Sequence, residues 1–313
     1  MTALQGPILI TGGNGLLGRA VLAALTEAGI GEVHAPGRSE LDLTDRARVQ
    51  AYVSNLRPQT VIHLASLVFG LGGNSRNQMR SLSHNGAIND NLLTALKECP
   101  AKRLFFAGTV ASYPFPYASM PLREEEFFNG LPHRGEFGYA MAKRQAWAYL
   151  EILAEDTGLE FTYGILTNLY GPGDRFDIEN GHVVPSLIAK AYEASGTAGS
   201  LRVWGDGSAT RDFLYVADAA RAILHCLSQP QSERLVNISS AEEVTIGKLA
   251  LTIAANFDHL PVDFDHSGAV GIPKRVIDNS RLLASGFSGF TSLDEGIART
   301  CRWYAENQGD IRR

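Results

Sequence analysis

A glycine-rich turn near the beginning of the chain restricts the fold more than any other feature. Residues 7–11 (PILIT) form a short apolar run, which the glycine-rich segment GGNGLLG and an amphipathic pattern follow. Gly13, Gly15 and Gly18 fit the spacing G-x-G-x-x-G. Gly12, Gly15 and Gly18 fit the related spacing G-x-x-G-x-x-G. Such glycines permit a tight turn, close approach of the backbone to a pyrophosphate, and packing of a helix on a strand. The sequence therefore predicts a strand, a dinucleotide-binding turn and a helix in that order.

Apolar runs alternate with amphipathic stretches through the first half of the chain. The predicted strands are 7–11, 32–35, 60–65, 103–108 and 161–166, and the predicted helices lie near 16–29, 44–56, 84–98 and 138–157. This alternation is typical of an α/β protein with a Rossmann-type, doubly wound parallel sheet. A further strand at 234–239 is expected to return to the same sheet.

Two segments have a different composition and indicate a smaller C-terminal substrate-binding lobe. Residues 167–210 and 256–290 are rich in loop-forming residues such as Gly, Asn, Asp and Pro. We predict a dinucleotide-binding domain at 1–167, to which 213–240 returns, and a substrate-binding lobe at 168–313. In open α/β sheets, ligands bind beyond the carboxyl ends of the strands, so the chemistry is expected where these ends meet the lobe.

The predicted cofactor contacts lie in the glycine turn and at the ends of the next strands. They are Gly12, Gly13, Asn14, Gly15, Leu16, Leu17, Gly18, Leu64 and Ala65. The second strand ends in HAPGRSELDLTD, without an acidic residue to bind a ribose 2′-hydroxyl, whereas Arg38 could pair with a 2′-phosphate. We therefore favour NADP(H) over NAD(H), the alternative being that Arg38 is a solvated loop residue. Asp42 either contacts the adenine or caps the helix that begins near Thr44.

A candidate catalytic group lies further along the chain. Tyr139 and Lys143 are four residues apart, on one face of a predicted helix. A free tyrosine has a pKa of about 10, and a nearby lysine cation stabilises the phenolate and lowers that pKa. Lys143 could also hold the nicotinamide ribose, and Thr109, after the fourth strand, could bond a substrate oxygen. Together these residues indicate transfer of a proton and a hydride at a carbon–oxygen centre, although Tyr-x-x-x-Lys pairs also arise by chance.

On these motifs the chain resembles the extended short-chain dehydrogenase/reductase family over nearly its whole length. Later blocks resemble the GDP-L-fucose synthases, namely TNLYGPGDRF (167–176), NGHVVPSLI (180–188), VWGDGSATRDFLYVADAA (203–220) and GIPKRVIDNSRL (271–282). Those enzymes epimerise and reduce GDP-4-keto-6-deoxymannose. The resemblance implies NADPH as reductant, Tyr139 as proton donor, Lys143 as its partner and Thr109 in place of a catalytic serine. It also implies a homodimer joined through helices of the cofactor domain.

One departure from that family concerns the epimerisation. The family reads Ser-Ser-Cys-x-Tyr-Pro after the fourth strand, whereas residues 109–114 here read TVASYP, with Ala111 at the cysteine position. The histidine partner of that cysteine is matched by His182, which is also assigned to the cofactor site. We therefore expect that reduction at carbon 4 is kept and that the double epimerisation is lost or altered. His182 could serve a single epimerisation, protonate or bind the sugar, or be structural. The cysteines at 99, 226 and 301 lie in helical contexts that favour structural roles.

Substrate contacts are expected from the second half of the chain. The candidates are Asn168 for a sugar hydroxyl, Lys190 for the diphosphate, Val203 or Trp204 for the base, and Arg211 for the nucleotide or its diphosphate. Bidentate pairing with phosphate suits Arg211, the alternative being a surface pair with Asp212. Residues 112–128 are predicted to form a packed loop over the active site, with the EEE run at 124–126 on a solvated face.

Charge and composition narrow the classes of protein to which this chain could belong. The net charge of −5 provides no basic field for nucleic acid or an anionic membrane. The three cysteines are scattered and show no metal-binding or disulfide spacing. The sequence also has no signal-peptide pattern and no apolar run long enough to span a bilayer. These features favour a cytoplasmic protein. The rival functions are a redox-neutral, NAD(P)-dependent nucleotide-sugar epimerase or dehydratase, a full bifunctional GDP-L-fucose synthase, and a non-catalytic dinucleotide sensor.

Overall fold

The computed structural model describes residues 4, 6–69, 71–179, 181–197, 199–229, 233–266, 272–309 and 311. Residues 180 and 271, which begin two of the sequence blocks named above, lie outside this described part, as do 267–270 within the segment 256–290. In the described part, no helix is both long enough and apolar enough to cross a membrane.

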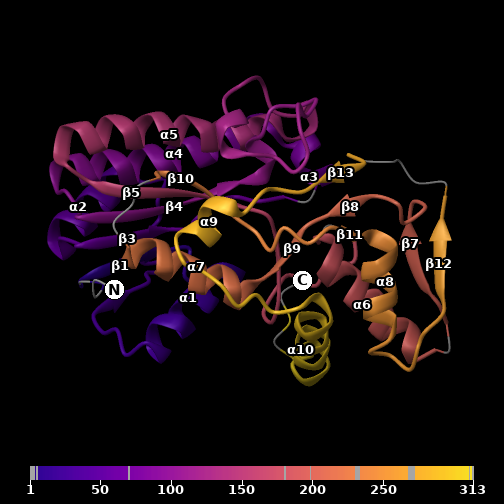
Figure 1. The fold of residues 1–313 in the computed structure, drawn as a ribbon. Coiled ribbons are helices and arrows are strands. Elements are labelled where there is room, and N and C mark those ends of the chain that lie inside the picture. The colour runs from indigo at the N-terminus through magenta and orange to yellow at the C-terminus, as the bar shows by residue number, and fades with distance from the viewer. Residues whose placement is uncertain are drawn as a thin grey trace.

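A six-stranded parallel sheet forms the centre of the larger part of the molecule (Figure 1). Its strand order is β10-β5-β4-β3-β1-β2. The strands are β1 (Ile8–Thr11), β2 (Val33–His34), β3 (Thr60–His63), β4 (Arg103–Thr109), β5 (Glu160–Leu166) and β10 (Leu235–Ile238). The predicted Rossmann-type sheet is confirmed, and the late strand at 234–239 does return to it beside β5. Apolar residues fill both faces of the inner strands, as expected for a sheet covered on both sides.

Helices cover the two faces of this sheet, and Figure 1 shows the two layers on opposite sides. On one side lie α2 (Arg46–Leu56), α4 (Gln78–Glu98) and α5 (Phe137–Thr157), and on the other α1 (Leu16–Glu27) and α7 (Val216–Ser228). The prediction placed the start of α4 at residue 84, but the helix begins at Gln78. Its first turns pack near the beginning of α5, which is a long-range contact that helix propensity does not report.

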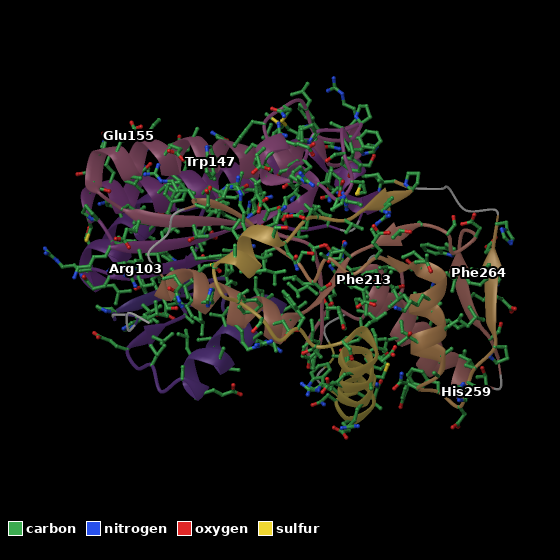
Figure 2. All side chains as sticks on the ribbon, in the orientation of Figure 1. Arg103, Trp147, Glu155, Phe213, His259 and Phe264 are labelled. Atoms are coloured by element: carbon green, nitrogen blue, oxygen red, sulfur yellow. The ribbon has the colours of Figure 1, made fainter. Side chains whose placement is uncertain are left out.

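A smaller part follows, built mostly from the second half of the chain. Its helices are α6 (Val183–Ser195), α8 (Ile246–Ala254) and α10 (Leu293–Glu306). Its short strands are β6 (Asn168–Tyr170), β7 (Leu201–Trp204), β8 (Thr210–Arg211), β9 (Phe213–Tyr215), β11 (Val244–Thr245), β12 (Val262–Asp265) and β13 (Lys274–Arg275). Figure 2 shows Phe264 on β12 at the far side of this part and Phe213 close to the central sheet. The part has a buried apolar core of its own, to which Phe213 contributes.

The segment 112–128 forms the predicted packed loop. Its aromatic rings contact one another, with Tyr113 and Phe127 edge to face at 5.3 Å between ring centres. The prediction that the acidic run 124–126 is solvated is wrong for Glu124. This side chain is buried, and its Oε1 accepts a hydrogen bond of 2.8 Å from the backbone N–H of Asn237. Burial raises the pKa of Glu124 above its usual value, and an unpartnered carboxylate would not be stable there.

Candidate active site

A cavity of about 350 Å³ lies beyond the carboxyl ends of β1, β2 and β3, where the fold predicts a ligand. Its lining comes from the glycine turn, the segment after β2, the segment after β3 and one face of α4. The lining residues are Thr11, Gly12, Gly13, Asn14, Gly15, Pro36, Gly37, Arg38, Leu41, Asp42, Leu43, Leu64, Ala65, Ser66, Leu67, His84 and Ile88.

Backbone contacts within the turn explain its glycines. Gly12 has a φ of +77°, a left-handed conformation that L side chains rarely adopt. A Cβ on Gly18 would lie 2.2 Å from the carbonyl oxygen of Gly12, so the helix and the turn can approach this closely only without a side chain. Helix α1 begins directly after Gly15, whose N–H donates to the carbonyl of Gly12 at 2.9 Å. The unpaired N–H groups of the first helical turn are therefore at the cavity, which suits a phosphate.

Five other predicted cofactor residues lie in or beside this turn, in different environments. Asn14 is exposed and lines the cavity. The backbone N–H groups of Leu64 and Ala65 donate to the carbonyl and the hydroxyl of Thr11 at 3.1 and 3.4 Å, which joins β3 to the turn. Leu17 packs instead against the core between the sheet and α1. Leu16 opens the same helix beside it.

Arg38 and Asp42 lie together at the rim of the cavity. The Nε of Arg38 is 3.5 Å from Oδ2 of Asp42, and the Arg38 side chain is 75% exposed. Oδ1 of Asp42 accepts hydrogen bonds from the N–H and the hydroxyl of Thr44 at 3.0 and 2.7 Å, which lower the pKa of this carboxyl. The residue that caps α2 is Asp45, since its side chain accepts from the N–H of Arg48. The alternative in which Asp42 caps that helix is therefore wrong.

The structure brings the predicted catalytic side chains together. The phenol of Tyr139 lies close enough to the side chains of Thr109 and Ser66 for both to lower its pKa. Thr109 is the last residue of β4, and its Oγ1 accepts from the N–H of Ala111 at 3.2 Å. Lys143 follows one helical turn after Tyr139, is 1% exposed, and its Nζ lies 4.8 Å from the centre of the Phe106 ring.

The pKa values in this group differ from the expectation. We expected Lys143 to lower the pKa of Tyr139, but burial raises that pKa to about 12, against the opposing effect of the nearby Ser66 and Thr109 side chains. Burial also lowers the pKa of Lys143 to about 7. The prediction was wrong because desolvation, which the sequence does not reveal, outweighs the pairing of charges. A phenol with this pKa keeps its proton at neutral pH, as a proton donor must.

Close contacts fix the beginning of α5, which carries Tyr139 and Lys143. A Cβ on Gly138 would lie 2.1 Å from the carbonyl oxygen of Gln78, so α4 and α5 touch here through backbone. The carboxylate of Glu136, just before α5, pairs with Arg275 of β13 at 2.6 Å, and both side chains are almost fully buried. This ion pair ties α5 to the smaller part of the molecule.

A second set of contacts fixes the loop that follows Thr109. The guanidinium of Arg144 donates to three carbonyl groups of this loop at 2.5–2.8 Å, those of Ser112, Phe127 and Gly130. Arg144 directly follows Lys143 in α5, so the loop is attached to the helix that carries the predicted catalytic pair. The bonds to Ser112 and Phe127 satisfy partly buried backbone acceptors, whereas the bond to Gly130 is exposed.

Ala111 is buried in a short 3₁₀ turn directly after Thr109. The cysteines do not take its place, since Cys226 lies in α7, Cys301 in α10 and Cys99 at the end of α4. Burial raises the pKa of both Cys226 and Cys301 to about 12, which makes their thiols inert. His182 precedes α6, and its side chain reaches the solvent. Desolvation by the surrounding protein and, next, the charge of Arg175 lower the pKa of its imidazole.

The predicted substrate residues lie in the smaller part. Trp204 is 64% exposed, and the Nζ of Lys190 lies 4.2 Å from the centre of its ring. Val203 is 1% exposed and belongs to the core, so the proposal of packing on a base rests on Trp204. The amide of Asn168 donates to the carbonyl of Asp212 at 2.9 Å, which holds it at the junction with the sheet.

Arg211 and Asp212 point to different neighbours. Arg211 donates to the carbonyl of Thr210 at 2.8 Å, and burial lowers the pKa of its guanidinium to about 10. Asp212 is fully buried, and its Oδ2 accepts from the hydroxyl of Ser239 at 2.5 Å and the N–H of Ile277 at 3.4 Å. The alternative of a surface pair between Arg211 and Asp212 is therefore wrong. The contact of Arg211 with the nucleotide or its diphosphate stays a prediction.

The burial of Asp212 predicts a pH dependence of stability. Burial raises its pKa from 3.8 to about 7. The folded state thus holds a proton that the unfolded chain releases, so the contribution to stability is complete below pH 3.8 and is lost as the pH rises through about 7. A shift of about three units corresponds to at most about 4 kcal/mol. We expect the free energy of unfolding of Asp212→Asn, measured by urea titration, to rise relative to that of the wild type as the pH increases from 4 to 7. Parallel pH curves for the two proteins would contradict this.

The residues around the cavity fit NADP(H). The glycine cradle has no room for a Cβ and suits a pyrophosphate, the walls formed by Leu41, Leu43 and Ile88 are apolar, and Arg38 supplies a cation at the rim. Among the described residues, no group of three or more His, Cys, Asp or Glu side chains is placed to hold a metal ion.

Sequence reasoning missed several residues of the cavity. Ser66 and Leu67 continue the predicted pair Leu64 and Ala65, so their position at the end of β3 was a usable signal. His84 and Ile88 come from α4, and nothing local places them at this edge of the sheet. Burial and the nearby Arg38 lower the pKa of His84.

Comparisons with known proteins agree with this geometry. A sequence model of the NAD-dependent epimerase/dehydratase family matches residues 8–239. A GDP-L-fucose synthase of Sinorhizobium fredii is 32% identical, over 97% of this chain and 96% of its own length. A GDP-L-colitose synthase of Yersinia pseudotuberculosis is 31% identical, over 97% of this chain and 99% of its own. The crystal structure of a GDP-L-fucose synthetase from Naegleria fowleri bound to NADP superposes with a TM-score of 0.91 at 32% identity, covering 100% of this chain and 98% of that one.

Proposed function

This chain belongs to the NAD-dependent epimerase/dehydratase family and is an enzyme similar to GDP-L-fucose synthases, and we propose that it is an NADPH-dependent reductase of a GDP-linked 4-keto sugar. The observation that carries the proposal is the placement of the Tyr139 phenol. It lies close enough to Thr109 at the end of β4 and to Ser66 of the cavity wall for both side chains to lower its pKa, and it lies one helical turn from Lys143. A proton donor, a hydroxyl partner and a cation thus meet at the edge of the dinucleotide cavity.

The proposed chemistry uses these side chains in defined roles. Tyr139, protonated at neutral pH, gives its proton to the oxygen of the substrate carbonyl. The hydroxyl of Thr109 bonds the same oxygen, and the Lys143 cation stabilises the phenolate that remains. NADPH, when bound, supplies the hydride that is added to carbon 4. His182 and Lys143 are also proposed to contact the cofactor.

NADPH rather than NADH is proposed as the reductant because of the charge at the rim of the cavity. Arg38 lies there and is well exposed, while the nearby Asp42 is turned to the N–H and hydroxyl of Thr44. A guanidinium pairs with a 2′-phosphate in a bidentate manner that a ribose hydroxyl cannot match. The structural relative from Naegleria fowleri, which binds NADP, supports this choice.

Substrate binding is assigned to the smaller part of the molecule. We propose that Arg211 and Lys190 bind the diphosphate, that Trp204 packs on the base and that Asn168 bonds the sugar. The partly desolvated guanidinium of Arg211 and the exposed indole of Trp204 beside Lys190 support these roles. GDP is the proposed nucleotide because the relatives described above are named for GDP-linked sugars.

The double epimerisation is proposed to be lost or altered. Ala111 stands where GDP-L-fucose synthases have a cysteine, and a methyl group exchanges no proton. His182 is retained near the substrate lobe, where it serves a single epimerisation or binds the sugar. The methyl side chain of Ala111 is fully packed, so the described residues put no acid or base at this position.

The test is to mix the purified protein with GDP-4-keto-6-deoxymannose in deuterated water and follow NADPH and NADH oxidation separately. We expect oxidation with a clear preference for NADPH. By mass spectrometry and NMR, the product should carry deuterium at no more than one of carbons 3 and 5. Ala111→Cys is the matched comparison for the epimerisation, and substrate incubated without enzyme corrects for spontaneous exchange. Deuterium at both carbons in the wild type would contradict the loss of epimerisation. Absence of oxidation, together with tightly bound NAD, would favour a redox-neutral epimerase or dehydratase.

The homodimer and the cytoplasmic location stay predictions. Ile152, 58% exposed on the outer face of α5, provides apolar surface on one of the helices at which the dimer is expected.

A further inference from the structure

A buried histidine lies between the glycine turn and the helix that carries Lys143. His63 ends β3, is fully buried, and pairs in register with Thr11 of β1 and Phe106 of β4. Because residues paired across parallel strands point to the same face, these side chains form a row on one face of the sheet. The Phe106 ring lies 5.3 Å from that of His63, centre to centre, and its centre lies 4.8 Å from the Nζ of Lys143. The row therefore leads from the turn to the lysine.

Asn89 in α4 determines which ring nitrogen of His63 carries the proton. The Nδ2 of Asn89 donates to the carbonyl of Ala142 in α5 at 3.2 Å, and a flipped amide would oppose oxygen to oxygen. The Oδ1 of Asn89 lies 3.1 Å from the Nε2 of His63 and can only accept, so Nε2 carries the proton. Burial, and next the charge of Lys143, lower the pKa of His63 to about 3. The ring is therefore neutral, and its Nδ1 has a free lone pair.

The hydroxyl of Thr11 continues this series of bonds to the cofactor cavity. Its Oγ1 lies 2.6 Å from the Nδ1 of His63, and because this nitrogen has no proton, the hydroxyl donates. The same Oγ1 accepts from the N–H of Ala65 at 3.4 Å, and Thr11 and Ala65 both line the cavity. Four hydrogen bonds with a common direction thus lead from the cavity wall to the backbone of α5, at the residue before Lys143.

We propose that His63 and Asn89 are positioning residues that hold Lys143 in a fixed place relative to the dinucleotide cavity. The inference rests on the proposed reductase function, in which the cation of Lys143 stabilises the phenolate of Tyr139. Hydrogen bonds suit this task because they are directional, whereas apolar contacts tolerate small displacements of one helix over another. Thr11, His63 and Asn89 are at most 3% exposed, so water does not replace a lost partner.

The neutral state of the His63 ring is part of the proposal. A protonated ring has two N–H donors, so it would direct one of them at the hydroxyl of Thr11, which now donates to that nitrogen. It would also add a second cation near Lys143, and like charges oppose each other's ionisation. The tautomer that Asn89 selects therefore joins the two helices to the cavity without competing with the charge of the lysine.

The position of Lys143 can be measured directly by NMR. In full-length protein with ¹³C-labelled lysine, the ring current of Phe106 should shift the signal of the Lys143 ε-CH₂ group, which Lys143→Arg assigns. We expect Asn89→Leu, which keeps a buried side chain but removes its hydrogen bonds, to lose most of this shift. In turnover assays, the same change should lower kcat by about tenfold and leave the KM for the keto sugar unchanged, because small displacements near the reacting atoms are costly. His63→Phe, which keeps a ring on the Phe106 side, should have the same effects.

Asn91→Leu is the matched control. Asn91 is also a buried asparagine of α4, and its amide also donates to a backbone carbonyl, that of Leu43 at 2.9 Å. This change should leave the Lys143 signal as it is in the wild type. An unchanged Lys143 signal in Asn89→Leu and His63→Phe, or an equal change in Asn91→Leu, would overturn the inference.

A measurement on the wild type tests the same bonds without any substitution. By ¹⁵N NMR, His63 should carry its proton on Nε2 and stay neutral from about pH 5 to about pH 8, where an ordinary histidine titrates. A proton on Nδ1, or titration in this range, would overturn the inference. If the wild type reduces no keto sugar but the Lys143 signal moves in Asn89→Leu and not in Asn91→Leu, the proposed function fails while the positioning of Lys143 stands.

Discussion

Tyr139→Phe is expected to lower the reductase rate by on the order of 100- to 10,000-fold, the usual contribution of a general acid. The change removes the phenol oxygen but keeps the ring that packs at the start of α5. Binding of NADPH should change little, because the tyrosine does not line the cavity of the glycine turn. The measurement is single-turnover reduction of the GDP-linked keto sugar, with NADPH affinity determined by fluorescence on the same samples.

Tyr149→Phe is the control for that experiment. Tyr149 lies on the same helix and is partly buried, and its phenol lies near Asp90, which raises its pKa, rather than near a group of the site. Its variant should reduce the substrate at the wild-type rate. Wild-type activity in Tyr139→Phe would show that another group supplies the proton, and equal losses in both variants would indicate a general effect on α5.

Gly18→Ala is expected to abolish binding of the dinucleotide. A Cβ at this position would lie 2.2 Å from the carbonyl oxygen of Gly12 and 2.6 Å from the Cα of Gly13. Both are backbone atoms, so no side-chain rotation relieves the contact, and the turn must move away from α1. We expect a loss of about 1–3 kcal/mol in the free energy of unfolding. We also expect at least a roughly tenfold weaker affinity for NADPH, equal to about 1.4 kcal/mol. Denaturant titration and NADPH fluorescence measure the two effects.

Gly31→Ala provides the matched substitution. A Cβ on Gly31 would meet nothing within 4 Å, so the change adds the same methyl group without a contact. Stability and affinity should both remain close to those of the wild type. Gly18→Ala protein that binds NADPH with unchanged affinity would mean that the phosphates do not lie at this turn.

The fold could be predicted largely from local patterns. The run PILIT, the glycine turn and the following amphipathic stretch correspond to β1, the turn and α1, because strand and helix periods and steric demands on glycine act over a few residues. The start of α4 was misplaced at residue 84 instead of Gln78. Its first turns are held by contact with α5, some sixty residues away, where Gln78 bonds the N–H of Gly138.

The candidate site was predicted in part, and the limits have physical causes. The spacing of Tyr139 and Lys143 is a property of one helix and is readable from sequence. The association of Tyr139 with Thr109 followed from the order of strands, since the carboxyl ends of parallel strands meet at one edge. Glu124 was expected in solvent because acidic runs usually are, yet its partner is a backbone amide of β10 more than one hundred residues later.

The sequence by itself determined the parallel sheet, the glycine turn, the Tyr–Lys pair and the missing cysteine at Ala111, because each depends on residue identity and short spacing. Only the tertiary structure decided how far each ionisable group is desolvated and which hydroxyls meet. Burial moves the pKa of Tyr139 to about 12 and that of Lys143 to about 7. The Oδ1 of Asn85 in α4 accepts from the hydroxyl of Ser66, which follows β3 and lines the cavity. Desolvation and hydrogen-bond direction arise from atoms that are distant in the chain, and no local pattern records them.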